Sequence, residues 1–302
     1  MTSTTVRRMA LSIAVVTALT GAAACTSSGS SGSSGDSGKD DKAGRKGGVV
    51  VSPVAALRLA EKSTSSADSA RVKSTTTMGT MMSMEADGAL DWSDGYTGTM
   101  TIEYTGGTMA DQMRQMGTTK MEARYLEDAY YAQMGDKFAD QAGGKHWIKY
   151  DYDALAEAAG GSGAYMKDQM QNTTPNQSVK LLLASGDVKK VGEETVRGEQ
   201  TTHYSGTVEV ADLAEKNSDL TEDQLADLKK QLQQAGITTE TIDIWVNDKD
   251  LLVKKVEKGE MTSGTMSQTA YYSDYGVKVS TETPPAGDTV DFTELIGNQP
   301  AA

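Results

Sequence analysis

The sequence predicts an α+β fold, in which a curved antiparallel sheet has a cluster of helices over one face. Predicted strands gather in two groups, and predicted helices gather between them instead of alternating with single strands, which is typical of this class. In the second group, Ile242, Ile244 and Val246 alternate with Asp243 and Trp245, the period of a strand with one face on a core and one toward water. The apolar face of such a sheet must be covered, and we expect the helices to cover it.

Residues 1–24 have the pattern of a secretory signal peptide. Arg7 and Arg8 precede an apolar run, and small residues follow this run before the single cysteine, Cys25. The run, Met9–Leu19, is too short to cross a bilayer as a stable helix. We therefore expect residues 1–24 to be removed and the mature chain to lie outside the cytoplasm.

The cysteine directly after these small residues resembles the lipobox of bacterial lipoproteins, although Ala22 stands where Leu is usual. In that pattern the cysteine receives a diacylglyceryl group and becomes the first residue of the mature protein. The resemblance thus implies lipidation of Cys25 and attachment to the outer face of the cell membrane. The alternative is an ordinary secreted protein with one stray thiol, but a lone secreted cysteine has no disulfide partner within the chain.

The chain is strongly acidic. Its formal net charge is -13, and removal of residues 1–24, which hold two basic residues and no acidic one, lowers it to -15. A surface of this charge repels nucleic-acid phosphates and anionic lipid head groups. We therefore expect no nucleic-acid partner, and we expect membrane contact through the lipid anchor instead of a basic patch.

Residues 25–48 are predicted to be the lipidated cysteine and a tether, and residues 49–297 a single domain. Ser and Gly dominate the tether, a composition that buries too little apolar surface to fold. About 250 residues follow, enough for one sizeable core, which must be stable without an intramolecular disulfide. We expect a monomer without a cofactor, and residues 298–302 are predicted to be a tail.

The domain begins with a helix and continues with a meander of strands. Ser52 suits the N-cap and Pro53 the first helical position, and apolar residues follow at helical spacing to about Ser66. The residues from Asp91 to Gly95 fit the turn of a β-hairpin. The strands expected in this half span Ala70–Thr80, Met82–Trp92, Tyr96–Tyr104, Thr119–Leu126, Ala129–Met134 and Trp147–Tyr150.

Helices follow in the middle of the chain, and a second group of strands completes the sheet. Short helices are predicted over 153–159, 165–171 and 177–185, separated by Gly-rich and Pro-containing breaks. Thr221 opens an amphipathic helix that ends at Gly236, with Gln224 in the capping-box position. The second group of strands is predicted over Val188–Val196, Gln200–Val210, Glu240–Val246, Leu251–Glu260 and Met266–Tyr272.

Three stretches of the second half, mainly within residues 188–291, carry a family resemblance. They are Val191–Gly198 with Thr202–Gly206, Ile244–Asn247 with Asp250–Lys254, and Tyr272–Val277 with Pro284–Gly287. These stretches resemble the LppX/LprG type of actinobacterial lipoproteins. The resemblance implies a LolA/LolB-like fold, a half-barrel sheet wrapped over helices that encloses an apolar cavity for acyl chains. Proteins of this type carry lipids or lipoglycans or act as accessory envelope proteins, and they are not enzymes.

Apolar side chains of the predicted helices and of the strand at 240–246 are the candidates for lining such a cavity. Leucines on the helices at 177–185 and 221–235 would face the isoleucines of the strand. The candidate lining residues are Leu57, Met113, Leu181, Leu182, Leu225, Leu228, Leu232, Ile242, Ile244 and Val246.

The sequence gives little evidence for a catalytic site or a metal site. His146 and His203 have no second His or Cys near them in sequence, so we interpret both as structural residues and expect no zinc site and no catalytic residue. Methionine is frequent, and ten of the sixteen lie between Met78 and Met134. Thioethers bind Cu(I) outside the cytoplasm. Methionines also build adaptable apolar surfaces, so both interpretations stay open.

We predict a membrane-anchored extracytoplasmic lipoprotein that binds or carries a lipophilic ligand, a lipid or lipoglycan, and that is not an enzyme. The alternative is a regulatory or accessory lipoprotein that docks on a membrane sensor or transporter. The two hypotheses differ in whether a cavity holds a ligand. A Cu(I)-handling protein is the third hypothesis.

Overall fold

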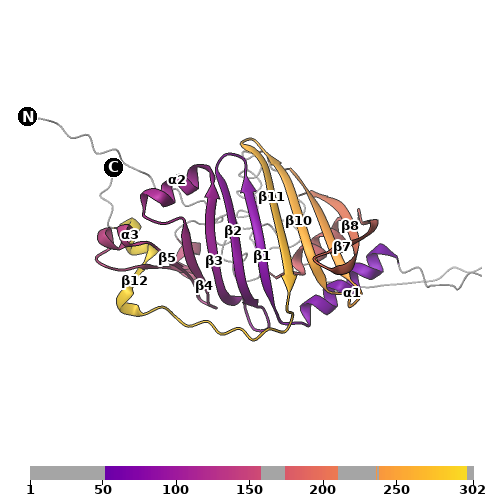
Figure 1. Ribbon diagram of the computed structural model, residues 1–302, viewed down its shortest axis with the longest axis horizontal. Coiled ribbons are helices and arrows are strands. Elements are labelled where there is room, and N and C mark those ends of the chain that lie inside the picture. The colour runs from indigo at the N-terminus through magenta and orange to yellow at the C-terminus, as the bar shows by residue number, and fades with distance from the viewer. Residues whose placement is uncertain (1–51, 158–173, 210–235, 237, 298–302) are drawn as a thin grey trace, which may run out of the picture.

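A single twelve-stranded sheet dominates the structure, a computed structural model that describes residues 52–157, 174–209, 236 and 238–297 (Figure 1). The strands lie in the order β12-β6-β5-β4-β3-β2-β1-β11-β10-β9-β8-β7. They are β1 (Ser69–Met78), β2 (Met82–Asp91), β3 (Thr97–Gly106), β4 (Lys120–Tyr125), β5 (Ala129–Gln133), β6 (Trp147–Asp151), β7 (Lys189–Val196), β8 (Glu199–Glu209), β9 (Thr239–Asn247), β10 (Leu252–Met261), β11 (Gly264–Ser273) and β12 (Thr289–Asp291).

Two antiparallel meanders form this sheet, β1 to β6 and β7 to β11, and they meet where β1 pairs with β11. In this pairing Val72 lies opposite Tyr272 and Met78 opposite Met266. The predicted groups of strands and their antiparallel pairing are confirmed. One edge differs, because β12 pairs with β6 in parallel. Strand β12 was not predicted from the sequence, because a strand of three residues is too short to show a period.

The described helices are short and few. Ser52 caps α1 (Pro53–Ser65) as expected, because its Oγ accepts a hydrogen bond from the amide of Ala55 at 3.2 Å. Residues 152–157 are also helical, in agreement with the start of the helix predicted over 153–159. The other helical segments are α2 (Gly107–Gln115), α3 (Asp136–Gln141), α5 (Gln177–Ser185), the 3-10 turn η1 (Ala286–Asp288) and α8 (Phe292–Gly297).

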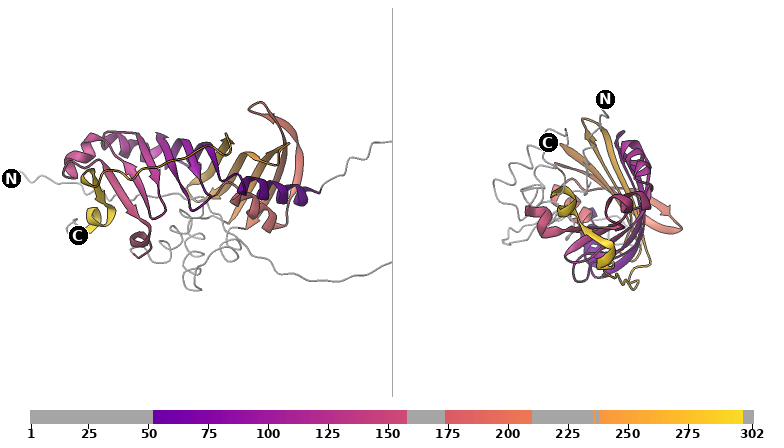
Figure 2. Two further views of the ribbon diagram at one scale, coloured as in Figure 1. Left: turned by 90° about the horizontal axis from the view of Figure 1, so that it is seen from below. Right: turned by 90° about the vertical axis from the view of Figure 1, so that its left-hand side faces the viewer.

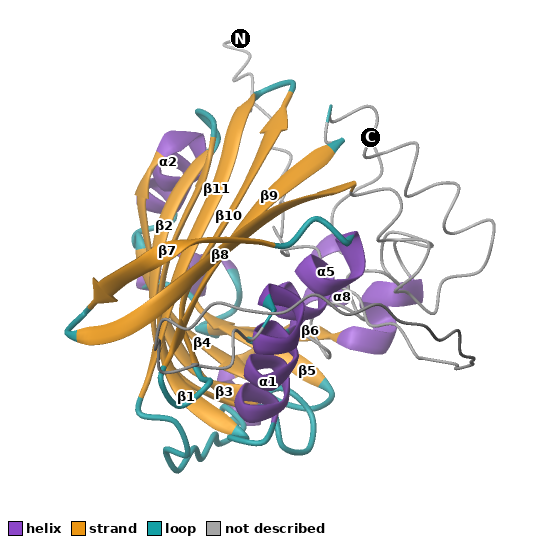
Figure 3. Ribbon diagram, turned by 90° about the vertical axis from the view of Figure 1, so that its right-hand side faces the viewer, coloured by secondary structure: helices purple, strands orange, loops and turns teal. Residues whose placement is uncertain are grey.

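The sheet is curved, and α1 and α5 lie side by side on its inner face (Figures 2 and 3). The expected α+β fold, with helices gathered on one face of a curved sheet, is therefore confirmed. No helix in the described part of the chain is both long and apolar enough to cross a membrane. The signal peptide, the tether with Cys25, and the helices predicted over 165–171 and 221–235 lie outside the described residues.

The main core lies on the inner face, where side chains from α1, α2, α5 and nearly every strand form one buried cluster, here called the main core cluster. The outer face of the second meander has a smaller cluster of its own, formed by Val196, Trp245, Val253 and Val256 with Tyr271 packed against it. Trp245 is only 6% exposed. The expectation that its side of the strand faces water is therefore wrong at this position.

Candidate ligand-binding face

The structure brings together the described candidates for lining a cavity. All of them belong to the main core cluster, although they come from three helices, α1, α2 and α5, and from one strand, β9, that are far apart in the chain. Leu225, Leu228 and Leu232 lie outside the described residues. The candidates brought together are Leu57, Met113, Leu181, Leu182, Ile242, Ile244 and Val246.

The inner face is densely packed beneath α5. Leu181 and Leu182 are fully buried, and α5 packs on β8 and β9. A Cβ atom added at Gly206 on β8 would lie 2.5 Å from Cδ1 of Leu182 and 2.0 Å from the carbonyl oxygen of Asp187. Since contacts this short leave no room for a methyl group, these leucines form closed core packing at this end of the sheet.

A row of aromatic rings lies over the other half of the inner face, and we call it the tyrosine row. Successive ring centroids are 5.3, 5.1, 5.6 and 4.8 Å apart, and each pair is tilted or edge-on, the geometry that aromatic rings favour. Tyr150 is buried and the other members are half-buried. In order along the row, the residues are Tyr96, Tyr125, Tyr130, Tyr150 and Phe292.

Strand register places these rings side by side. Tyr125 pairs with Tyr130 across β4 and β5, and Tyr130 pairs with Tyr150 across β5 and β6. Two positions away on the same face, Ala123 pairs with Ala132, so small side chains lie beside the rings. These tyrosines are not among the lining residues predicted from the sequence. The spacing of two residues in Ala123 and Tyr125, and in Tyr130 and Ala132, places each pair on one face of its strand, but it does not show that the rings are neighbours.

The tyrosine hydroxyls stay uncharged at neutral pH. Burial raises the pKa of Tyr125 to about 12, and it also raises the pKa values of Tyr96, Tyr130 and Tyr150. The row is therefore an uncharged aromatic surface that carries polar hydroxyl groups. Such a surface suits the apolar part of a ligand and can also form hydrogen bonds.

Charged side chains are buried beneath α5, on the inner face of β9 and β10. Lys255 Nζ lies 3.1 Å from Glu257 Oε1 and donates to Ser178 Oγ at 2.9 Å. The hydroxyl of Ser178 in turn donates to Glu257 Oε1. Glu240 is buried nearby, and its Oε2 has no hydrogen-bond partner within the described residues. We call Lys255, Glu257 and Glu240 the buried charge triad.

The buried charge triad contains one base and two acids. Burial raises the pKa of Glu240 to about 8, and repulsion from Glu257 adds to this effect, whereas Lys255 opposes it. Burial lowers the pKa of Lys255, but attraction to Glu257 and neighbouring groups outweighs burial, so that the pKa of Lys255 is raised. At pH 7 Lys255 therefore carries its positive charge and Glu240 is protonated.

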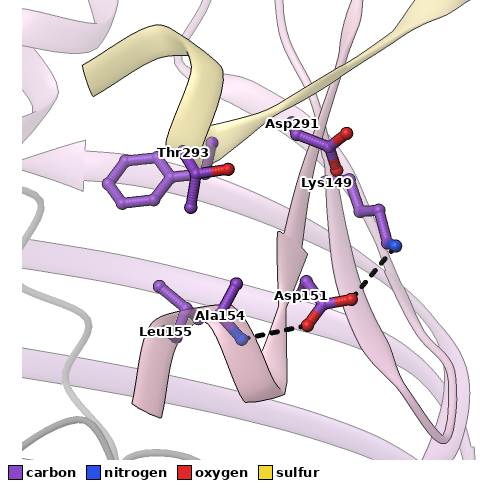
Figure 4. A pocket seen from close by; sticks show the side chains of 7 residues that line it. Lys149, Asp151, Ala154, Leu155, Asp291 and Thr293 are labelled. Carbon is purple, nitrogen blue, oxygen red and sulfur yellow. Dashed lines mark hydrogen bonds and ion pairs between the residues drawn. The ribbon is translucent and has the colours of Figure 1, made fainter. Parts of the chain in front are cut away.

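A small hollow lies where β6, β12 and α8 meet (Figure 4). Its volume is about 10 Å³, and Lys149, Asp151, Leu155 and Phe292 are among the residues that line it. Asp151 accepts from the amide of Ala154 at 3.0 Å and pairs with Lys149 at 3.2 Å, contacts that lower its pKa. Sites for drug-sized ligands are usually about 300–1,000 Å³. This hollow is therefore too small to hold a lipid.

Both histidines have structural partners. Nδ1 of His146 lies 2.7 Å from Oδ1 of Asp288, and this contact links the residue before β6 to the turn η1 before β12. His203 stacks on Trp245, with ring centroids 4.1 Å apart, and its Nε2 lies 2.8 Å from Oδ1 of Asp243. Over the described ranges, no three His, Cys, Asp or Glu side chains are grouped so that they could hold a metal ion.

Comparison with known proteins finds close relatives in Streptomyces. An uncharacterized 31.2 kDa protein of Streptomyces griseus, from the rplA-rplJ intergenic region, is 58% identical over 246 residues, 81% of this chain and 81% of that protein. A Streptomyces coelicolor protein named "Putative lipoprotein SCO4650" is 51% identical and covers 99% of both chains. No known family model matches the chain.

Among the solved structures similar to this chain is one of a lipoprotein of the LppX/LprG type. The crystal structure of the lipoprotein LppX from Mycobacterium tuberculosis has a TM-score of 0.45 at 15% sequence identity. The similarity covers 76% of this chain and 98% of that one.

Proposed function

Because the chain belongs to the family of these two Streptomyces proteins, we propose that it is an extracytoplasmic lipoprotein that binds a lipophilic ligand on the inner face of its sheet. The anchor in this proposal is a lipid on Cys25, and residues 26–48 tether the domain to the membrane surface. The name of the Streptomyces coelicolor relative supports the anchor. The domain at 49–297 is the part that carries the ligand.

The tyrosine row is the main observation that supports the proposed binding of a lipophilic ligand. Its rings, half-buried except for the buried Tyr150, form a continuous and uncharged surface on the inner face, away from the dense packing beneath α5. Burial of an acyl chain on such a surface contributes on the order of 0.8 kcal/mol per methylene group. A chain of ordinary length therefore binds measurably even if only part of it is covered.

Met113, a predicted lining residue in the same core cluster as Tyr150, allows a test of whether this face holds a ligand. It lies on α2, which packs on β2 and β3 at one end of the inner face, and its side chain belongs to the main core cluster. We expect Met113→Trp to abolish the uptake of a fluorescent fatty acid and to leave the unfolding midpoint near that of the wild type, because the added ring fills ligand space. A fully packed site would instead lose about 1–3 kcal/mol of stability.

The control for this substitution is Val191→Trp, which places the same ring at a side chain that is 59% exposed. This variant is expected to take up the fatty acid as the wild type does. The protein is also purified from its own host for native mass spectrometry with lipid extraction. If the wild type binds no acyl probe and copurifies with no lipid, the carrier hypothesis fails, and docking on a membrane sensor or transporter takes its place.

Changing Cys25→Ser tests the anchor. Without the thiol no diacylglyceryl group can be attached, so we expect the protein to move from the membrane fraction to the medium or to accumulate as unprocessed precursor. Fractionation and intact-mass measurement distinguish these two results. A variant that is processed and still membrane-bound would show that the anchor lies elsewhere.

A further inference from the structure

Seven methionines from both halves of the chain gather at one end of the sheet. They come from the β1–β2 hairpin, from the β10–β11 hairpin and from α2, and they form a core cluster separate from the main one. We call this group the methionine cluster. Its members are Met78, Met81, Met82, Met84, Met109, Met261 and Met266, with Tyr104 packed against them.

Three of these side chains form a buried row across adjacent strands. Met78 on β1 lies directly opposite Met82 on β2 and directly opposite Met266 on β11. Side chains directly opposite in antiparallel strands have Cβ atoms about 4.5–5.5 Å apart. The three are 8%, 3% and 8% exposed. Because Met is unbranched and has three rotatable bonds, thioethers at this spacing can turn toward one point.

Partly exposed methionines surround the buried row. Met81, Met84, Met109 and Met261 are each partly buried and pack against it. Because these four side chains are partly exposed, the methionine cluster reaches the surface of the protein, where a cation can meet it.

The backbone holds these segments tightly together. The amide of Met109 donates to the carbonyl oxygen of Met81 at 3.0 Å. Gly107 has φ +81°, and a Cβ atom there would lie 2.5 Å from the same carbonyl oxygen, so only glycine permits this approach of α2. A Cβ atom at Gly79 would likewise lie 2.2 Å from the carbonyl oxygen of Ser263. The two hairpins and α2 thus position the methionines before any ligand arrives.

The chemistry of the group selects one class of ligand. Thioethers are neutral, soft donors that favour Cu(I) over the hard or borderline cations that carboxylates and imidazoles bind. We propose that the methionine cluster binds a single soft monovalent cation, Cu(I) or Ag(I), through the thioethers of Met78, Met82 and Met266. This site is separate from the tyrosine row and does not depend on the binding of a lipophilic ligand.

The test uses the full-length mature chain with Cys25→Ser, so that no thiol competes for the metal. Cu(I) is titrated without oxygen against a chromogenic Cu(I) chelator. One equivalent is expected to bind, and replacing Met78, Met82 and Met266 together by Leu is expected to weaken binding by about 100-fold or more. Leu has nearly the volume of Met, so the fold is expected to persist.

A matched control replaces three buried methionines of the main core cluster, Met100, Met121 and Met134, by Leu. This control is expected to bind Cu(I) as the parent chain does. The proposal is overturned if the parent chain binds no Cu(I), if the cluster variant binds it equally well, or if the control loses as much affinity.

A second measurement needs no substitution in the cluster and therefore holds even if the triple variant does not fold. Methionine oxidation by peroxide is mapped by mass spectrometry with and without one equivalent of Ag(I). Silver is expected to protect Met78, Met82 and Met266 and to leave the oxidation of Met100 unchanged. Equal oxidation of the cluster with and without silver would overturn the proposal.

Discussion

Replacing Lys255 by Met is expected to lower the free energy of unfolding by about 3–5 kcal/mol at pH 7. The substitution removes the ammonium group that lies 3.1 Å from Glu257 and leaves that carboxylate in the core without a positive partner. Glu257 is almost fully buried, so water cannot replace the lost interaction. Urea unfolding followed by circular dichroism measures the change.

Two further variants show whether the cause is the unpaired charge. The double variant Lys255→Met, Glu257→Leu is expected to recover most of the lost stability, because no unpaired charge remains in the core. Lys258→Met, at an exposed position of the same strand, is expected to stay within about 0.5 kcal/mol of the wild type. A loss below about 1 kcal/mol for Lys255→Met would contradict the buried pairing.

Glu240 is expected to make the protein less stable as the pH rises from about 5 to about 8. Its pKa is raised to about 8 in the folded chain, whereas an unfolded glutamate has a pKa of about 4.3. Between these values the folded state keeps a proton that the unfolded state releases, so the free energy of unfolding falls with rising pH and levels off above the folded pKa. The expected loss from this group is about 2–4 kcal/mol.

The variant Glu240→Gln isolates this effect, because the amide keeps the shape of the protonated acid and does not titrate. Its stability is expected to change less than that of the wild type between pH 5 and 8, and to exceed it at pH 8.5. Glu103→Gln, at an exposed position of β3, is expected to keep the pH dependence of the wild type. Parallel pH profiles for Glu240→Gln and the wild type would show that Glu240 is ionised throughout.

The buried charge triad shows where reading a strand by its period fails. From Leu252, which points inward, strict alternation would place Val256 inward and Lys255 outward. A register shift between Leu252 and Lys254 reverses this pattern, so that Lys255 faces the core and Val256 joins the outer cluster. One extra residue changes the face of every side chain after it, and no feature of a single sequence marks where it occurs.

The strands themselves could be predicted because their residues alternate and turn residues separate them. The predicted lining residues of 177–185 and 240–246 also meet on one face, because the period of each element fixes which side chains point together. The tyrosine row and the methionine cluster could not be found in this way. Both depend on which strands are neighbours. The tyrosine row needs β4, β5 and β6 side by side, and the methionine cluster needs the pairing of β1 with β11, nearly 200 residues apart in sequence, which is set by long-range packing.

The pairing of β1 with β11 also fixes an order of assembly. Strands β1 to β6 come first in the sequence and can pair with one another locally. The other edge of β1 has no partner until β11 pairs with it. Closing so long a loop before its contacts are formed makes folding slow. We therefore expect refolding to be limited by the docking of the two meanders, with the edge of β1 exposed to wrong partners until then.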